Sequence, residues 1–117
     1  MTQDKDAIDV DALREITGGD EALERSLFAQ FRKVGEEDMA SLREAVARKD
    51  LMVAARAAHR LKGASATIGA THLAVLCQRC EHSARNGQLG PVEDGLDELE
   101  AQLRSVIAFV ERLYGDR

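Results

Sequence analysis

The sequence has few of the residues that build β-sheets or nucleic-acid surfaces. Its 117 residues include no tryptophan, one proline, three phenylalanines and one tyrosine. The β-branched residues never form an alternating run, which argues against strands. Because few aromatic side chains are present on which bases would stack, and because the net charge of −5 repels phosphates, we expect no nucleic-acid partner.

Long apolar segments are missing as well. No run approaches the roughly 20 residues that a helix needs to span a bilayer, and the polar start, Met1–Asp6, lacks the apolar segment of a signal peptide. We therefore expect a cytoplasmic location and no membrane contact by this domain. The length suits one domain with one hydrophobic core, for which we expect a disordered tail over residues 1–7 and a folded domain over 8–117.

Helix-forming residues and helical periodicity are what the sequence does contain. The spacing of apolar residues predicts helices over 9–17, 20–49, 50–68 and 71–86, and a last one that starts at Gly90-Pro91. Long helices with short connections predict an all-α fold, an antiparallel up-down-up-down four-helix bundle with a short N-terminal cap helix. A monomer is expected. In the second helix we predict Leu23 inside, and Phe28 and Met39 on a second face that is open to the cap helix or to a partner.

One stretch of the 50–68 helix combines residues that a core does not require. At about 100° per residue, His59 points away from Leu61 and so away from the apolar stripe. Lys62 follows at i+3 and Gly63 at i+4. A glycine inside a helix costs about 1 kcal/mol relative to alanine. We interpret Gly63 as space kept clear beside a reactive imidazole.

The sequence around His59 is basic within an acidic chain. Residues 53–85 hold one acidic residue, Glu81, and five basic ones: Arg56, Arg60, Lys62, Arg79 and Arg85. Such a patch indicates an anionic partner or group. A neutral imidazole is a nucleophile, and Lys62 would disfavour the charged ring and bind anionic oxygens. This combination fits phosphoryl transfer, in which positioning and charge neutralisation dominate.

Two other interpretations stay open at this stage. In the first, His59 is an ordinary exposed residue of a structural or adaptor bundle without phosphotransfer. In the second, Cys77 and Cys80 bind a metal with His72 and His82, since zinc ligands often come as C-x-x-C pairs. The two cysteines fall on the apolar stripe of their helix, so we predict two buried free thiols and no metal site.

The run His59-Arg60-Leu61-Lys62-Gly63-Ala64-Ser65, followed by Gly69-Ala70, Leu73, Cys77 and Glu81, resembles histidine-containing phosphotransfer (HPt) domains. The resemblance covers essentially the whole chain. It implies that His59 is phosphorylated, that Lys62 assists and that Gly63 makes room, while Ser65 and Gly69 support the helix packing and the turn. It also places Glu81 near the ring. From the sequence, Glu81 either orients the second ring nitrogen or pairs with Arg85 at i+4.

The same resemblance implies a phosphorelay intermediate, which is a carrier and not an enzyme. His59 would accept a phosphoryl group from a receiver-domain phosphoaspartate and pass it to another receiver aspartate. The expected partners are response-regulator receiver domains, with a hybrid sensor histidine kinase as a further partner or parent protein. We expect the receiver to supply Mg²⁺ and this chain to bind no cofactor. Met52, Arg56, Arg60 and Ala66 are expected to form the docking surface around His59.

Overall fold

The computed structural model describes residues 7–115, and all secondary structure within them is helical. The helices are α2 (Val10–Thr17), α3 (Glu21–Ala47), α4 (Leu51–Thr67), α5 (Thr71–Arg85) and α6 (Leu89–Tyr114). Their bounds lie close to the predicted ones. The tail expected over 1–7 lies outside the described residues except for Ala7, which is buried. Within the described part of the chain, no helix is long and apolar enough to cross a membrane.

Aspartates begin three of these helices. The side chains of Asp9, Asp20 and Asp50 each accept a hydrogen bond from the backbone N–H three residues later, at 3.0 to 3.1 Å. Such caps satisfy donors that the first turn of a helix leaves unpaired. The last helix begins at Leu89, slightly earlier than predicted, so that Pro91 lies within its first turn. Its missing N–H therefore removes no helical hydrogen bond.

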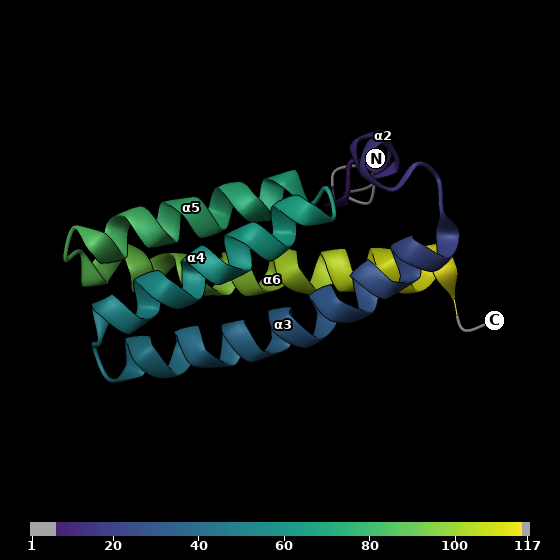
Figure 1. Ribbon diagram of the computed structural model, residues 1–117. Coiled ribbons are helices and arrows are strands. Elements are labelled where there is room, and N and C mark those ends of the chain that lie inside the picture. The colour runs from purple at the N-terminus through teal and green to yellow at the C-terminus, as the bar shows by residue number, and fades with distance from the viewer. Residues whose placement is uncertain (1–6, 116–117) are drawn as a thin grey trace.

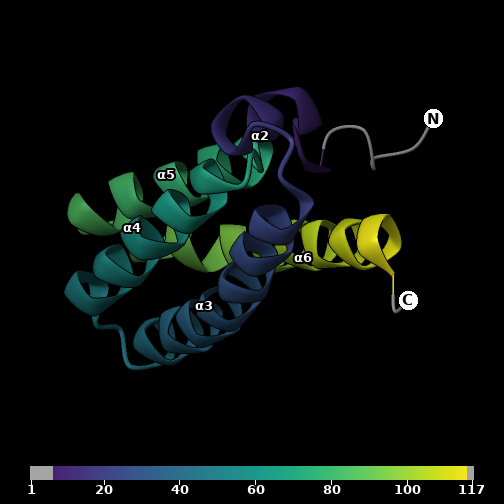
Figure 2. The same cartoon turned by 45° about the vertical axis from the view of Figure 1, so that its right-hand side comes forward.

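The four long helices lie side by side, and α2 lies across one end of them (Figure 1). Three residues join each long helix to the next, at 48–50, 68–70 and 86–88. Figure 2 shows α2 beside the turn between α4 and α5, where the backbone N–H of Asp9 donates to the carbonyl of Gly69 at 2.7 Å. Gly69 has φ +79°, and a Cβ there would lie 2.8 Å from the carbonyl oxygen of Asp9. Both the turn and this close approach therefore require glycine.

Small residues make α4 the central helix of the core. Four of its alanines are at most 2 % exposed, which allows α3 and α5 to pack closely on either side. The apolar stripe of α5, on which Cys77 and Cys80 were predicted to lie, is buried and consists of Leu73, Leu76, Cys77, Cys80 and Ala84. The core therefore fixes the backbone of α4 from two sides, while its third side faces solvent.

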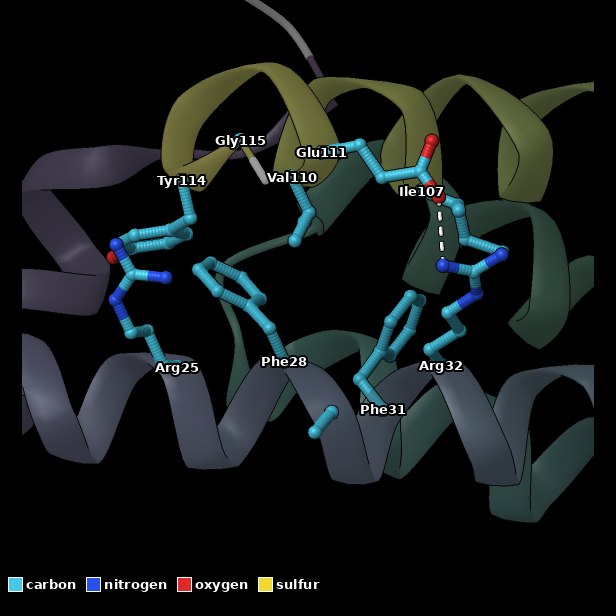
Figure 3. Close-up of a pocket in the computed structure, with 10 residues that line it drawn as sticks. Arg25, Phe28, Phe31, Arg32, Ile107, Val110, Glu111, Tyr114 and Gly115 are labelled. Atoms are coloured by element: carbon cyan, nitrogen blue, oxygen red, sulfur yellow. Dashed lines mark hydrogen bonds and ion pairs between the residues drawn. The ribbon is translucent and has the colours of Figure 1, made fainter. Parts of the chain in front are cut away.

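Two predictions for α3 are wrong. Leu23, predicted inside, is 41 % exposed, whereas Phe28 and Met39, predicted on a separate face, are 3 % and 2 % exposed. The buried stripe of α3 is rotated because α6 lies alongside it: the ring of Phe28 packs against Tyr114, with 5.2 Å between centroids (Figure 3). A Cβ at Gly35, in the same stripe, would lie 3.2 Å from a methyl group of Leu103. Phe28 and Met39 are therefore core residues and are not available to a partner.

Candidate functional site

His59 lies on the solvent side of α4. Its side chain is 59 % exposed, whereas Leu61 is fully buried. Gly63 is also exposed, and a Cβ built on it would meet no atom within 4 Å. Its backbone is helical, so neither the local conformation nor packing within the described residues requires glycine there. The surface beside the imidazole is open.

Glu81 of α5 faces the ring of His59. Its Oε2 lies 3.1 Å from Nδ1 of the imidazole, and the residue is 8 % exposed. Burial raises the pKa of Glu81, but the ion pair with Lys62 and the contacts with Arg85 and His59 outweigh that effect and lower it to about 2. The carboxylate is thus ionised near neutral pH and only accepts hydrogen bonds. In the neutral ring Nδ1 must therefore carry the proton, which leaves the Nε2 lone pair available.

Both roles considered for Glu81 occur together in the structure. Arg85 contacts the same carboxylate oxygen as His59, with Nε at 2.9 Å and Nη2 at 2.8 Å from Oε2. The ammonium of Lys62 lies 3.0 Å from Oε1, within ion-pair distance, although Oε1 has no hydrogen bond of good geometry. One buried carboxylate thus joins the imidazole to two cations. Lys62, expected to act on the ring directly, is paired here with Glu81.

The basic residues counted in the sequence do not form one patch. Arg79 lies away from His59, in a groove between α5 and α6 that Asp94 and Glu98 also line. Arg60 is exposed on α4, and its Nε donates to Oδ1 of Asp38 on α3 at 3.0 Å. The sequence count therefore overestimates the positive charge around His59, because carboxylates from α3 and α5 lie within it.

Asp38 pairs with Arg60, the residue that follows His59, and the sequence did not point to it. It is 5 % exposed, and its Oδ2 is buried with no hydrogen-bond partner among the described residues. Asp38 and Arg60 lie 22 positions apart. Their pairing depends on the register of α3 against α4, for which the local sequence carries no signal.

The other residues expected around His59 lie on or beneath the same face. Met52 is 68 % exposed and Ala66 is exposed. Arg56 is exposed and forms no ion pair with any described residue. Ser65 is buried, and its hydroxyl donates to the Leu61 carbonyl at 2.7 Å, which satisfies a polar group inside the core. The exposed face thus combines an apolar side chain, two small residues and cations.

The cysteines are separate from this face. Cys77 and Cys80 are buried free thiols, as predicted. Burial raises the pKa of Cys77 to about 12 and that of Cys80 to about 11, so both stay protonated. His72 and His82 are exposed. No cluster of three metal-binding side chains occurs among residues 7–115.

A hollow of about 260 Å³ between α3 and α6 also lies away from His59, since no residue of α4 or α5 lines it (Figure 3). Phe28, Phe31 and Val110 form its apolar wall. The arginines at its rim are paired within the chain, Arg32 with Glu111 at 2.7 Å and Arg25 with Glu21. The hollow therefore presents no unpaired charge that would select a ligand.

Comparison with known proteins relates the chain to one family. The family model described as "Hpt domain" matches residues 26–109, from the first part of α3 to near the end of α6. This span contains His59, Lys62, Gly63 and Glu81. No curated protein and no solved structure shows a significant match to the chain.

Proposed function

The chain belongs to the Hpt domain family, whose members carry phosphoryl groups in two-component phosphorelays, and we propose that His59 is its phosphoacceptor. A receiver domain with a phosphoaspartate docks over the exposed side of α4. His59 accepts the phosphoryl group, and the aspartate of another receiver takes it on. The observation that carries this proposal is the contact of 3.1 Å between Nδ1 of His59 and Glu81, which leaves Nε2 free on an open surface.

The transfer step follows from that tautomer. The Nε2 lone pair forms a bond to phosphorus while the bond from phosphorus to the aspartyl oxygen breaks, and that bond's electron pair remains on the receiver carboxylate. No proton has to move, because Nδ1 keeps its hydrogen. The ring gains positive charge as the bond forms, and the ionised Glu81 lies where it stabilises this charge. Transfer to the next aspartate is the reverse sequence.

Lys62 and Gly63 serve the incoming group. After transfer, the ammonium of Lys62 exchanges its contact with Glu81 for the phosphoryl oxygens, since it lies within one turn of the ring. Gly63 leaves the approach to Nε2 clear for the phosphoryl group and for the receiver. Glu81 and Lys62 therefore act on opposite charges, one on the ring and the other on the phosphoryl group.

We further infer an up-down-up-down antiparallel order for the four long helices, because connections of three residues leave no length for a crossover along the bundle. In the proposed complex the receiver supplies Mg²⁺ together with the aspartate. The same scheme applies whether this domain acts alone or beside a hybrid sensor kinase.

The test is uptake of label from a panel of phosphorylated receiver domains. The wild-type protein should acquire an acid-labile, base-stable label, which is typical of phosphohistidine, and His59→Gln should not. His72→Gln and His82→Gln are matched controls, since both histidines are exposed on α5, and both variants should be labelled normally. Equal labelling of His59→Gln and wild type would exclude His59 as the acceptor. Failure of wild type with every receiver would favour the adaptor interpretation.

A further inference from the structure

Asp38 occupies a position at which a carboxylate destabilises the fold. It is 5 % exposed, and one of its two oxygens has no hydrogen-bond partner among the described residues. A buried acceptor without a partner loses its hydration without compensation, and an apolar residue of similar size would fill the same place at lower cost. The carboxylate thus has a role that core packing does not supply.

The hydrogen bond that the carboxylate accepts comes from Arg60. Nε of Arg60 lies 3.0 Å from Oδ1 of Asp38, while the arginine side chain is 54 % exposed. Neither terminal amino group of Arg60 has a partner among residues 7–115. Arg60 follows His59 in α4 and lies about 100° around the helix, towards α3. An anchored guanidinium with unused donors therefore borders the face that carries the imidazole.

Several other cations near this face or on α6 are paired with carboxylates, whereas Arg56 on the same face forms no ion pair among the described residues. Lys62 and Arg85 share Glu81. Arg104 on α6 is 50 % exposed, much like Arg60, yet its Nη1 donates to Glu36 and its Nη2 to Glu100. Arg60 differs because its tie to the chain uses Nε alone, which leaves the planar pair of amino groups for an external carboxylate.

We propose that Asp38 is a positioning residue, and that the Asp38–Arg60 pair presents a preoriented guanidinium to a surface carboxylate of the receiver domain that docks over His59. This inference rests on the proposed phosphotransfer function and adds the α3 side of the docking surface to it. An arginine fixed before association loses less side-chain entropy when it binds. Because the pair contacts the partner rather than the phosphoryl group, it lowers KM for the phosphorylated receiver and leaves kcat unchanged.

The experiment measures kcat and KM for transfer from one phosphorylated receiver. Arg60→Ala should raise KM about tenfold, as loss of a central interface arginine does, and Asp38→Ala about threefold. The double variant should match Arg60→Ala, because Asp38 acts only through Arg60. In all three, kcat should stay within about twofold. Arg104→Ala is the matched control, an arginine of similar exposure whose amino groups are already paired within the chain, and its KM should equal that of wild type.

Three further experiments separate positioning from folding. The Arg60 Nε–H resonance in NMR spectra should be protected from exchange in wild type and lose that protection in Asp38→Ala. Arg60→Lys keeps the positive charge but lacks the planar pair of amino groups. Its KM should therefore be raised as in Arg60→Ala. Should Asp38→Ala not fold, Asp38→Asn keeps an acceptor without the charge and should show a smaller rise in KM.

Normal KM in both single variants would overturn this inference while leaving phosphotransfer intact, provided that wild type is labelled. A fall in kcat, or additive effects in the double variant, would overturn it as well. Loss of labelling in wild type itself would instead contradict the proposed function on which the inference rests.

Discussion

Replacing Gly63 with alanine should stabilise the protein and impair it at the same time. The added methyl group meets no atom within 4 Å, so the folded state accepts it without a clash. Position 63 lies inside α4, where alanine is favoured over glycine by about 1 kcal/mol. For a domain of this size, that gain corresponds to a rise in Tm of about 3 to 5 °C. The free energy of unfolding should therefore increase by about 1 kcal/mol.

Phosphotransfer should respond in the opposite direction. The methyl group projects from the same face as His59, one turn further along α4, where the phosphoryl group and its carrier must approach. A displacement of about 1 Å at reacting atoms costs on the order of a hundredfold in rate. We therefore expect kcat/KM for a phosphorylated receiver to fall by at least about tenfold, and further in Gly63→Val.

Gly95→Ala provides the matched control for this experiment. Gly95 lies inside α6, and a Cβ there also meets nothing within 4 Å, but it belongs to the groove between α5 and α6 and not to the His59 face. This variant should gain the same stability, measured by urea unfolding, and transfer at the wild-type rate. If Gly63→Ala is destabilised, or if it transfers as fast as Gly95→Ala, the interpretation of Gly63 as cleared space is wrong.

Four further predictions concern Glu81, Gly69 and Met52. Glu81→Ala should slow label uptake by about 10- to 100-fold, which corresponds to the loss of a charge-assisted hydrogen bond. In this variant ¹⁵N NMR should show that the proton of the His59 imidazole is no longer fixed on Nδ1. An unchanged tautomer would refute the role of Glu81 in orienting the ring. Because the pKa of Glu81 is lowered from 4.5 to about 2, its stabilisation is complete above about pH 4.5 and lost as pH falls towards 2. The pKa shift limits the contribution of Glu81 to the free energy of unfolding to about 3 kcal/mol, and solvent screening of the exposed Arg85 reduces this contribution to about 1 to 2 kcal/mol. The unfolding free energies of wild type and Glu81→Gln should therefore converge in acid. Gly69→Ala should cost at least about 2 kcal/mol of unfolding free energy, since it combines a positive φ with a clash against Asp9, and a variant as stable as wild type would contradict that account. Met52→Asp should slow transfer while stability changes by less than about 0.5 kcal/mol, because Met52 is 68 % exposed; normal transfer would remove Met52 from the docking surface.

The parts of the fold that the sequence predicted depend on short-range physics. Asp20 and Asp50 mark helix starts because a cap needs only the N–H groups of the next three residues. The inward face of α5 follows from periodicity within one helix. The rotated stripe of α3 does not, since Leu23 and Phe28 are equally apolar. Which of them is buried depends on where α6 lies, since Tyr114 of α6 packs against Phe28.

The same distinction between local contacts and contacts between helices applies to the candidate site. His59, Lys62 and Gly63 were identified together because they lie within two turns of one helix. The sequence left Glu81 between two roles because i+4 pairing with Arg85 is local, whereas contact with His59 depends on the register of two helices. The structure resolves this by placing both partners on one oxygen, at 2.8 to 3.1 Å.

Gly63 and Asp38 share a property that explains why one was found and the other missed. Each lowers the stability of the fold, Gly63 through helix propensity and Asp38 through an unpaired buried oxygen. Departures from what folding favours are expected at functional positions. The cost of a helical glycine is visible in the sequence, since it arises wherever the helix forms. The cost of a carboxylate appears only once α4 packs over it, so the positioning role proposed for Asp38 could be inferred only from the structure.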